Sequence, residues 1–132
     1  MRRTGTKADH EIEILKKNLR ELRDKGKVLI AVLFGSQANG DAHVRSDIDL
    51  GLYLPVMDQE EELQIVDRIL MCSDLPVSIL RLDDDDESPL IVQEALKGVH
   101  LVEPDTEALY GVYHRVLHES EAVRSRKELG LG

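Results

Sequence analysis

The sequence predicts a single domain of the α/β or α+β class. Short aliphatic runs alternate with amphipathic helical segments along the 132 residues, and this order is typical of a sheet packed against helices. A domain of this length removes about two-thirds of its unfolded surface from water. The sequence contains one Phe, three Tyr and no Trp, so the core must be aliphatic. We therefore expect residues 1–132 to form one domain without repeats or linkers.

Four segments have the periodicity of helices. The first, residues 8–25, places aliphatic residues at three- and four-residue spacing and ends at Gly26, a glycine suited to a C-terminal cap. The other three are expected from Asp58 or Gln59 to about Met71, from the cap Ser88 and Pro89 to Lys97, and at 106–126. The second helix and the last are each expected to bury one apolar stripe, and Tyr110 and Tyr113 are expected to pack. The two stripes are Leu63, Val66, Ile69 and Leu70, and Leu109, Val112, Val116 and Leu117.

Four apolar runs are expected to form strands, at 28–34, 48–54, 77–82 and 99–102. The first run is continuously aliphatic, which suits a strand buried on both faces. A glycine ends it and a proline ends the second, because both residues interrupt strand pairing. A further short helix is expected at 36–41.

Charge and cysteine content exclude several classes of protein. The net charge is −9, from 26 acidic and 17 basic residues, so broad nucleic-acid binding is not expected, whereas docking onto a basic protein is compatible. The single Cys72 excludes an internal disulfide and a Cys-based zinc site, and its apolar context predicts a buried structural thiol. No apolar run is long enough to cross a membrane, and no signal core follows Met1. We expect a soluble cytoplasmic protein.

The most informative segment joins the first two expected strands. A turn at Gly35 and Ser36 follows the first strand, and Asp47 and Asp49 stand at the start of the second. Side chains alternate along a strand, so the two acids face one way, about 7 Å apart at the backbone. Two such carboxylates can hold one divalent cation, and a Gly-Ser turn can offer N–H groups to phosphate. The alternatives are a solvated strand start for the acids and a plain turn for the Gly-Ser pair.

The turn reads Gly35-Ser36-x-Ala38-x-Gly40, and the next strand begins Ser46-Asp47-Ile48-Asp49-Leu50. Together they resemble the signature of minimal nucleotidyltransferases, the MNT-type members of the DNA polymerase beta-like superfamily. The resemblance implies a mixed sheet of about four strands packed against helices. It also implies transfer of a nucleoside monophosphate, as AMP from ATP, to a hydroxyl of a protein or RNA, with release of pyrophosphate. Many such proteins are antitoxins beside a helical HEPN-type partner.

The same resemblance assigns roles to individual residues. Asp47 and Asp49 would be the catalytic and metal-ligating residues of a two-Mg²⁺ site. Gly35, Ser36 and Ser46 would bind the nucleotide.

The sequence departs from the family pattern in two places. A third carboxylate usually stands on the next strand, at the position that Ser78 occupies here. Asp74 and Asp83 would be about 13 and 16 Å away on an extended strand. Asn39 stands where many relatives have Arg, and Arg45 is a candidate to replace that charge. A hydroxyl is a poor magnesium ligand and a poor base, so only one metal site would be well formed.

These departures leave three hypotheses open: a slow magnesium-dependent nucleotidyltransferase, a catalytically weak antitoxin-like subunit that masks a HEPN-type partner, and a nucleotide sensor. A homodimer is compatible with each of them. Two other features favour ordinary interpretations. The acidic run at 83–87 lacks the spacing and glycine of an EF-hand loop, so a solvated loop is expected. His114 and His118 have no evident third ligand, so an exposed helix face is expected there.

Overall fold

The computed structural model describes residues 7–35, 47–56, 58–84 and 86–128, with side chains described within 9–118. The described elements are, in order, α1 (Lys7–Asp24), β1 (Ile30–Phe34), β2 (Ile48–Tyr53), α3 (Gln59–Met71), β3 (Val77–Arg81), α4 (Pro89–Leu96), β4 (Val99–His100) and α5 (Thr106–Glu128). The predicted helices and strands are confirmed, with ends shifted by a few residues. The helix expected at 36–41 lies outside the described residues.

The four strands form one mixed sheet in the order β3-β2-β1-β4. β1 pairs antiparallel with β2 and with β4, whereas β2 and β3 are parallel. A parallel pair needs a crossover connection, and α3 provides it. The α/β class and the mixed sheet of about four strands are therefore confirmed.

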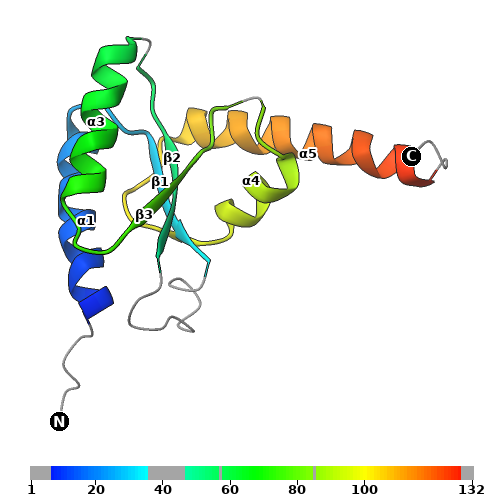
Figure 1. Cartoon of the computed structure of the whole chain (residues 1–132). Helices are drawn as coiled ribbons and strands as arrows, with labels where there is room; N and C mark the ends of the chain where they lie inside the picture. The colour runs from blue at the N-terminus through cyan, green and yellow to red at the C-terminus, as the bar shows by residue number, and fades with distance from the viewer. Residues whose placement is uncertain (1–6, 36–46, 57, 85, 129–132) are drawn as a thin grey trace.

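Helices cover both faces of the sheet, with α1 and α3 on one and α4 and α5 on the other (Figure 1). Alternation along β2 separates the two cores. Ile48, Leu50 and Leu52 are fully buried among residues of α1 and α3. Across β1, Ile30 and Val32 lie in the second core with Val92 of α4 and Val112 of α5. No helix in the described part of the chain is both long and apolar enough to cross a bilayer.

Helix ends follow the expected chemistry with one exception. Gly26 has a φ of 74°, and the N–H of Lys27 donates to the carbonyl of Leu22 at 2.9 Å, so the predicted cap of α1 is confirmed. Asp58 caps α3 by accepting from the N–H of Glu60 at 3.2 Å. Ser88 occupies the N-cap position of α4, but its side chain makes no capping hydrogen bond. Pro89 sets the backbone angle of that first turn without it.

Two predicted apolar stripes are wrong in part. In α3 the sheet-facing residues are Ile65 and Ile69, whereas Leu63 is 59% and Leu70 40% exposed. Both choices satisfy helical spacing, and only the placement of the helix on the sheet decides between them.

In α5, Ala108, Val112 and Val116 form the buried stripe, and the expected packing residues Tyr110, Tyr113 and Leu117 are exposed. Cys72 is half-buried and donates to the carbonyl of Ile69.

Candidate functional site

Asp47 and Asp49 lie together where β2 begins. Asp49 is the second residue of the strand, and exposed Asp47 stands just before it. Because Ile48 and Leu50 point into the α1/α3 core, Asp49 points toward the side of α4 and α5. Partial burial, and then the charge of Asp47, raises the pKa of the Asp49 carboxyl above its ordinary 3.8. Asp47 is thus close enough for its charge to oppose ionisation of the Asp49 carboxyl.

Gly35 closes directly over the Asp49 carboxylate. It follows Phe34, the residue of β1 that pairs with Asp49, and it has a φ of 76°. A Cβ added there would lie 2.3 Å from Oδ2 and 3.2 Å from Cγ of Asp49. Glycine is therefore required at this position for two reasons: the positive φ angle, and the space that the Asp49 carboxylate fills. Ser36 and Ser46, the other predicted nucleotide-binding residues, lie outside the described residues, as do Asn39 and Arg45.

Ser78 stands beside Asp49 on the neighbouring strand. The two residues are paired in register between β2 and β3, and adjacent strands lie about 4.8 Å apart. Val77 and Ile79 pack toward the α1/α3 core and Leu80 toward the other core, so exposed Ser78 shares the face of Asp49. The hydroxyl therefore flanks the carboxylate pair.

The two nearby acids lie outside the strand pair that holds Asp49 and Ser78. The Asp83 carboxylate accepts from the Arg81 guanidinium at 3.0 and 2.8 Å. Asp74 precedes β3, and its N–H donates to Oε1 of Glu11 at 2.6 Å. Neither residue belongs to the strand pair that holds Asp49 and Ser78. The structure therefore brings together Asp47, Asp49, Gly35 and Ser78, and leaves both of these acids outside.

Close packing on the same face sets the position of the site. A Cβ on Gly51 would lie 3.3 Å from Cδ2 of Leu82 and 3.7 Å from Cβ of Ala95. α4 thus covers the middle of this face of β2, and the carboxylates stand beyond it at the end of the strand. The sequence analysis missed this role of Gly51 and the contact of Gly35 with Asp49. A glycine inside a strand is the signal for a close approach of this kind.

The donor set fits a divalent cation that also binds phosphate. Within the described part of the chain, neither Asp47 nor Asp49 forms an ion pair or hydrogen bond that would balance its charge. Mg²⁺ is commonly bound by one or two carboxylates together with substrate phosphates, and these two acids supply that number. No group of three or more metal-ligating His, Cys, Asp or Glu side chains occurs among the described residues.

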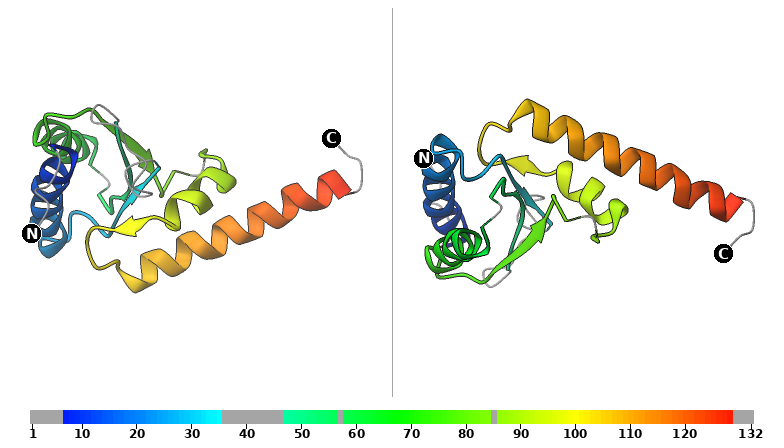
Figure 2. Two further views of the ribbon diagram at one scale, coloured as in Figure 1. Left: turned by 90° about the horizontal axis from the view of Figure 1, so that it is seen from below. Right: turned by 90° about the horizontal axis from the view of Figure 1, so that it is seen from above.

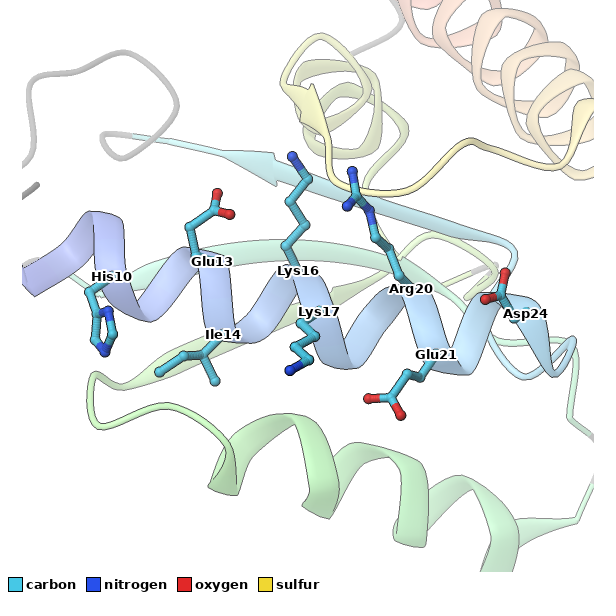
Figure 3. A pocket seen from close by; sticks show the side chains of 8 residues that line it. All are labelled: His10, Glu13, Ile14, Lys16, Lys17, Arg20, Glu21 and Asp24. Atoms are coloured by element: carbon cyan, nitrogen blue, oxygen red, sulfur yellow. The ribbon is translucent and has the colours of Figure 1, made fainter.

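The remaining candidates do not form a second site. His114 and His118 stack with ring centroids 6.4 Å apart on the exposed side of α5, and no third ligand joins them among the described residues. A cavity of about 510 Å³ lies along α1. Figure 3 shows Lys16 and Arg20 on one side of that helix and Lys17 and Glu21 on the side facing α3. Its lining mixes both signs of charge, so it favours no ligand.

Comparisons with known proteins agree with this arrangement. The family model described as Polymerase beta, Nucleotidyltransferase matches residues 13–107. A search of curated proteins gives no match.

Several solved structures have a similar fold. A chain of a toxin–antitoxin complex with AMP-PNP is 17% identical, with a TM-score of 0.63 over 86% of this chain and 94% of that one. A chain of the complex between a tri-AMPylated Shewanella oneidensis HEPN toxin and an MNT antitoxin is 13% identical, with a TM-score of 0.60 over 91% and 95%. A chain of the toxin–antitoxin MntA-HepT is 15% identical, with a TM-score of 0.60 over 90% and 95%.

The family model covers more than half of the chain, from α1 to the start of α5. The structural neighbours support the fold independently of sequence identity. The protein therefore belongs to the polymerase beta nucleotidyltransferase family, and its resemblance to the minimal nucleotidyltransferases is confirmed.

Proposed function

We propose that the protein is a magnesium-dependent nucleotidyltransferase that transfers AMP from ATP to a hydroxyl of a macromolecular acceptor. The observation that carries this proposal is the contact between Gly35 and the Asp49 carboxylate, with Asp47 beside it. A small-residue turn against two acids without a charge partner among the described residues is suited to a triphosphate that arrives with its cation. Family membership supports the reaction class.

The proposed step is an in-line displacement. The acceptor hydroxyl oxygen bonds to the α-phosphorus, the bond from that phosphorus to the oxygen bridging to the β-phosphate breaks, and pyrophosphate leaves with that electron pair. The hydroxyl proton passes to solvent. Mg²⁺, when bound, would neutralise phosphate charge in this reaction. Asp47 and Asp49 would hold the cation, and Gly35 would let the backbone approach the phosphates. We assign phosphate binding to Ser36 and Ser46 from the motif alone.

Ser78 makes the proposed enzyme a slow one. It occupies the strand position next to Asp49, where a carboxylate would act as a ligand or base. Loss of one acid–base group commonly lowers a rate by about 100- to 10,000-fold. The acceptor hydroxyl would then lose its proton to water rather than to a fixed side chain.

The proposed partner is a HEPN-type protein, and the proposed setting is a toxin–antitoxin pair. A chain of similar fold occurs in a complex with a tri-AMPylated HEPN toxin. The net charge of −9 is compatible with a basic partner. A hydroxyl on that partner is the acceptor we propose first, and an RNA hydroxyl is the alternative.

Transfer of label from α-labelled ATP to the partner, in the presence of magnesium, tests the proposal. We expect slow labelling by the native protein and labelling up to about 100-fold faster by Ser78→Asp, because that change returns a carboxylate beside Asp49. Ser78→Asn is the matched control, since it has the same size without the charge. No label transfer by the native protein or by Ser78→Asp would contradict the enzyme hypothesis.

The second candidate is a subunit that masks its partner without catalysis, and the missing third carboxylate favours it. It predicts that Asp47→Asn still neutralises the partner in a growth assay. Loss of neutralisation by Asp47→Asn, with the complex still formed, would eliminate this candidate and support catalysis.

A further inference from the structure

β3 is five residues long and has one backbone edge that pairs with no other strand in the described part of the chain. The sheet order places β3 at one side, and two backbone bonds fix which residues face β2. The N–H of Ile48 donates to the carbonyl of Pro76 at 2.9 Å, and the N–H of Leu82 donates to the carbonyl of Leu52 at 2.8 Å. In a parallel ladder the backbone groups of alternate residues bond to a given neighbouring strand. The N–H and C=O groups of the even-numbered residues of β3 therefore face β2. The amides of Val77, Ile79 and Arg81 point outward.

Those outward amides have no backbone partner among the described residues. The carbonyl of Arg81 accepts from the N–H of Asp84 at 3.4 Å, and no other backbone bond engages this edge within the described part of the chain. The opposite edge, β4, offers only two residues. An exposed strand edge is a template for pairing with another chain, and β3 is the longer of the two.

An apolar surface flanks the open edge. Arg68 of α3 points toward α1, since it bonds to Asn18 at 3.1 Å and to Glu21 at 3.2 Å. Val66 and Leu70 stand two positions before and after Arg68, so each is rotated about 200° from Arg68 around the helix axis. Leu63 lies on the same side of the helix as these two residues. These three residues therefore face away from α1. We call them the α3 flank.

The α3 flank lies on the side of β3. Figure 2 shows α1 beside the half of the sheet that contains β4 and β1, and α3 beside the half that contains β2 and β3. Glu62 of α3 pairs with Arg81 of β3, which ties the two elements together. Leu63 is 59% and Leu70 40% exposed, so the α3 flank presents exposed apolar side chains beside the outward edge of β3.

Charge around the edge determines what can occupy it. Exposed acids stand at both ends of the strand, Asp74 before β3 and Asp84 and Asp86 after it, and α3 adds exposed Glu60 and Asp67. A second copy would bring the same acids together in a protein of net charge −9, and like charges oppose such pairing. The complementary occupant is an extended segment with apolar residues at alternate positions and Lys or Arg between them.

We propose that β3 binds an extended basic–apolar segment of a partner protein as a fifth strand of the sheet. Alternate side chains of that segment pack on the α3 flank, and the intervening side chains lie on the face of Ser78 and Asp49. A residue opposite Ser78 stands two strand spacings, about 10 Å, from Asp49 at the backbone. Given the proposed function, a Ser, Thr or Tyr there would be the acceptor; the docking itself does not depend on that reaction.

The probe is a nine-residue peptide of alternating valine and lysine with serine at its centre, labelled for fluorescence anisotropy. We expect the native protein to bind it without ATP or magnesium. Leu63→Arg combined with Leu70→Arg should weaken binding at least about 10-fold, since it removes apolar contact and repels lysine. Leu117→Arg, at a leucine of α5 that is 51% exposed, is the matched control and should bind normally. The same peptide with every second amide N-methylated should not bind, because methylation removes the strand hydrogen bonds.

Several outcomes would overturn the docking proposal. These are no binding at millimolar peptide, equal binding of the methylated peptide, or equal loss with Leu117→Arg. A native dimer that dissociates in the Leu63→Arg, Leu70→Arg variant would assign the edge to a second copy instead. Peptide binding without any AMP transfer would refute the proposed function alone, and AMP transfer without peptide binding would refute the docking site alone.

Discussion

The side chains of β2 alternate between two faces of the sheet, and the two faces differ in the kinds of side chain they carry. Leu50 points into the α1/α3 core and is fully buried, and its neighbour Asp49 points to the other side, where the strand emerges from under α4. On that second side Gly51 admits Leu82 and Ala95 at close range. One face thus uses large side chains for stability. The other uses a small residue to bring α4 close and keeps its carboxylates clear at the end.

Asp49→Asn should produce the largest functional effect on the open face. The amide keeps the size of the side chain but removes a charge that would hold the cation, so AMP transfer should fall on the order of 1,000-fold. Calorimetry with magnesium and ATP should show the matching loss of binding. If the variant bound and transferred like the native protein, the site would not be at this strand end.

Leu50→Ala should affect the closed face in the opposite way. Truncation of a fully buried leucine commonly lowers the free energy of unfolding by about 2–5 kcal/mol, because it leaves a cavity. Urea denaturation measures this loss. The nucleotide affinity of the folded protein should be unchanged, since Leu50 points to the opposite face of the sheet from Asp49. A specific loss of binding in fully folded Leu50→Ala protein would show that the two faces are coupled.

Gly35→Ala and Gly26→Ala form a matched pair with a smaller expected effect. Their φ angles are 76° and 74°, so both changes should destabilise the fold by roughly 1 kcal/mol. An added Cβ meets Oδ2 of Asp49 at Gly35 but nothing within 4 Å at Gly26. Only Gly35→Ala should therefore displace the carboxylate and weaken magnesium–ATP binding, by about 10-fold. Equal nucleotide affinities in the two variants would argue against a role for this contact.

The elements and the polarity of each face of β2 were predictable because local patterns encode them. Alternation alone put Asp47 and Asp49 on one side, and the helix spacing and Gly26 located α1. The same reasoning could not choose the buried stripe of α3. Apolar residues occupy two adjacent faces of that helix, and contacts with a sheet distant in sequence select Ile65 and Ile69.

Long-range pairing also explains what local sequence patterns, apart from the family resemblance, did not reveal about the site. The position of Ser78 beside Asp49 depends on the parallel register of β2 and β3, which no local pattern states. The contact of Gly35 with Asp49 depends on the pairing of β1 with β2. The open edge of β3 follows from the strand order. Sequence thus predicts which residues would carry the chemistry, and tertiary pairing determines which of them meet.

The smallest expected effect is a pH dependence of the free energy of unfolding that arises from Asp49, on the open face of β2. Burial and Asp47 raise the pKa of Asp49 above 3.8 in the folded state. The folded protein therefore binds more protons than the unfolded chain just above that pH, and stability falls as pH rises through the raised pKa. Asp49→Asn should thus be more stable than the native protein at pH 7 by less than about 1 kcal/mol, since the group is partly solvated. The difference should vanish below pH 3.8.

Thermal unfolding across pH measures this difference, with Asp67→Asn as the control for removing one charge from an acidic protein. Asp67 is exposed on α3, on the other side of the sheet from Asp49. Magnesium with ATP should raise the unfolding temperature of the native protein at pH 7 but not that of Asp49→Asn, because a bound cation compensates the charge that burial opposes. A gain in stability equal to that of Asp67→Asn would mean that Asp49 is an ordinary surface acid, and the open face of β2 would then lose its electrostatic distinction from the rest of the surface.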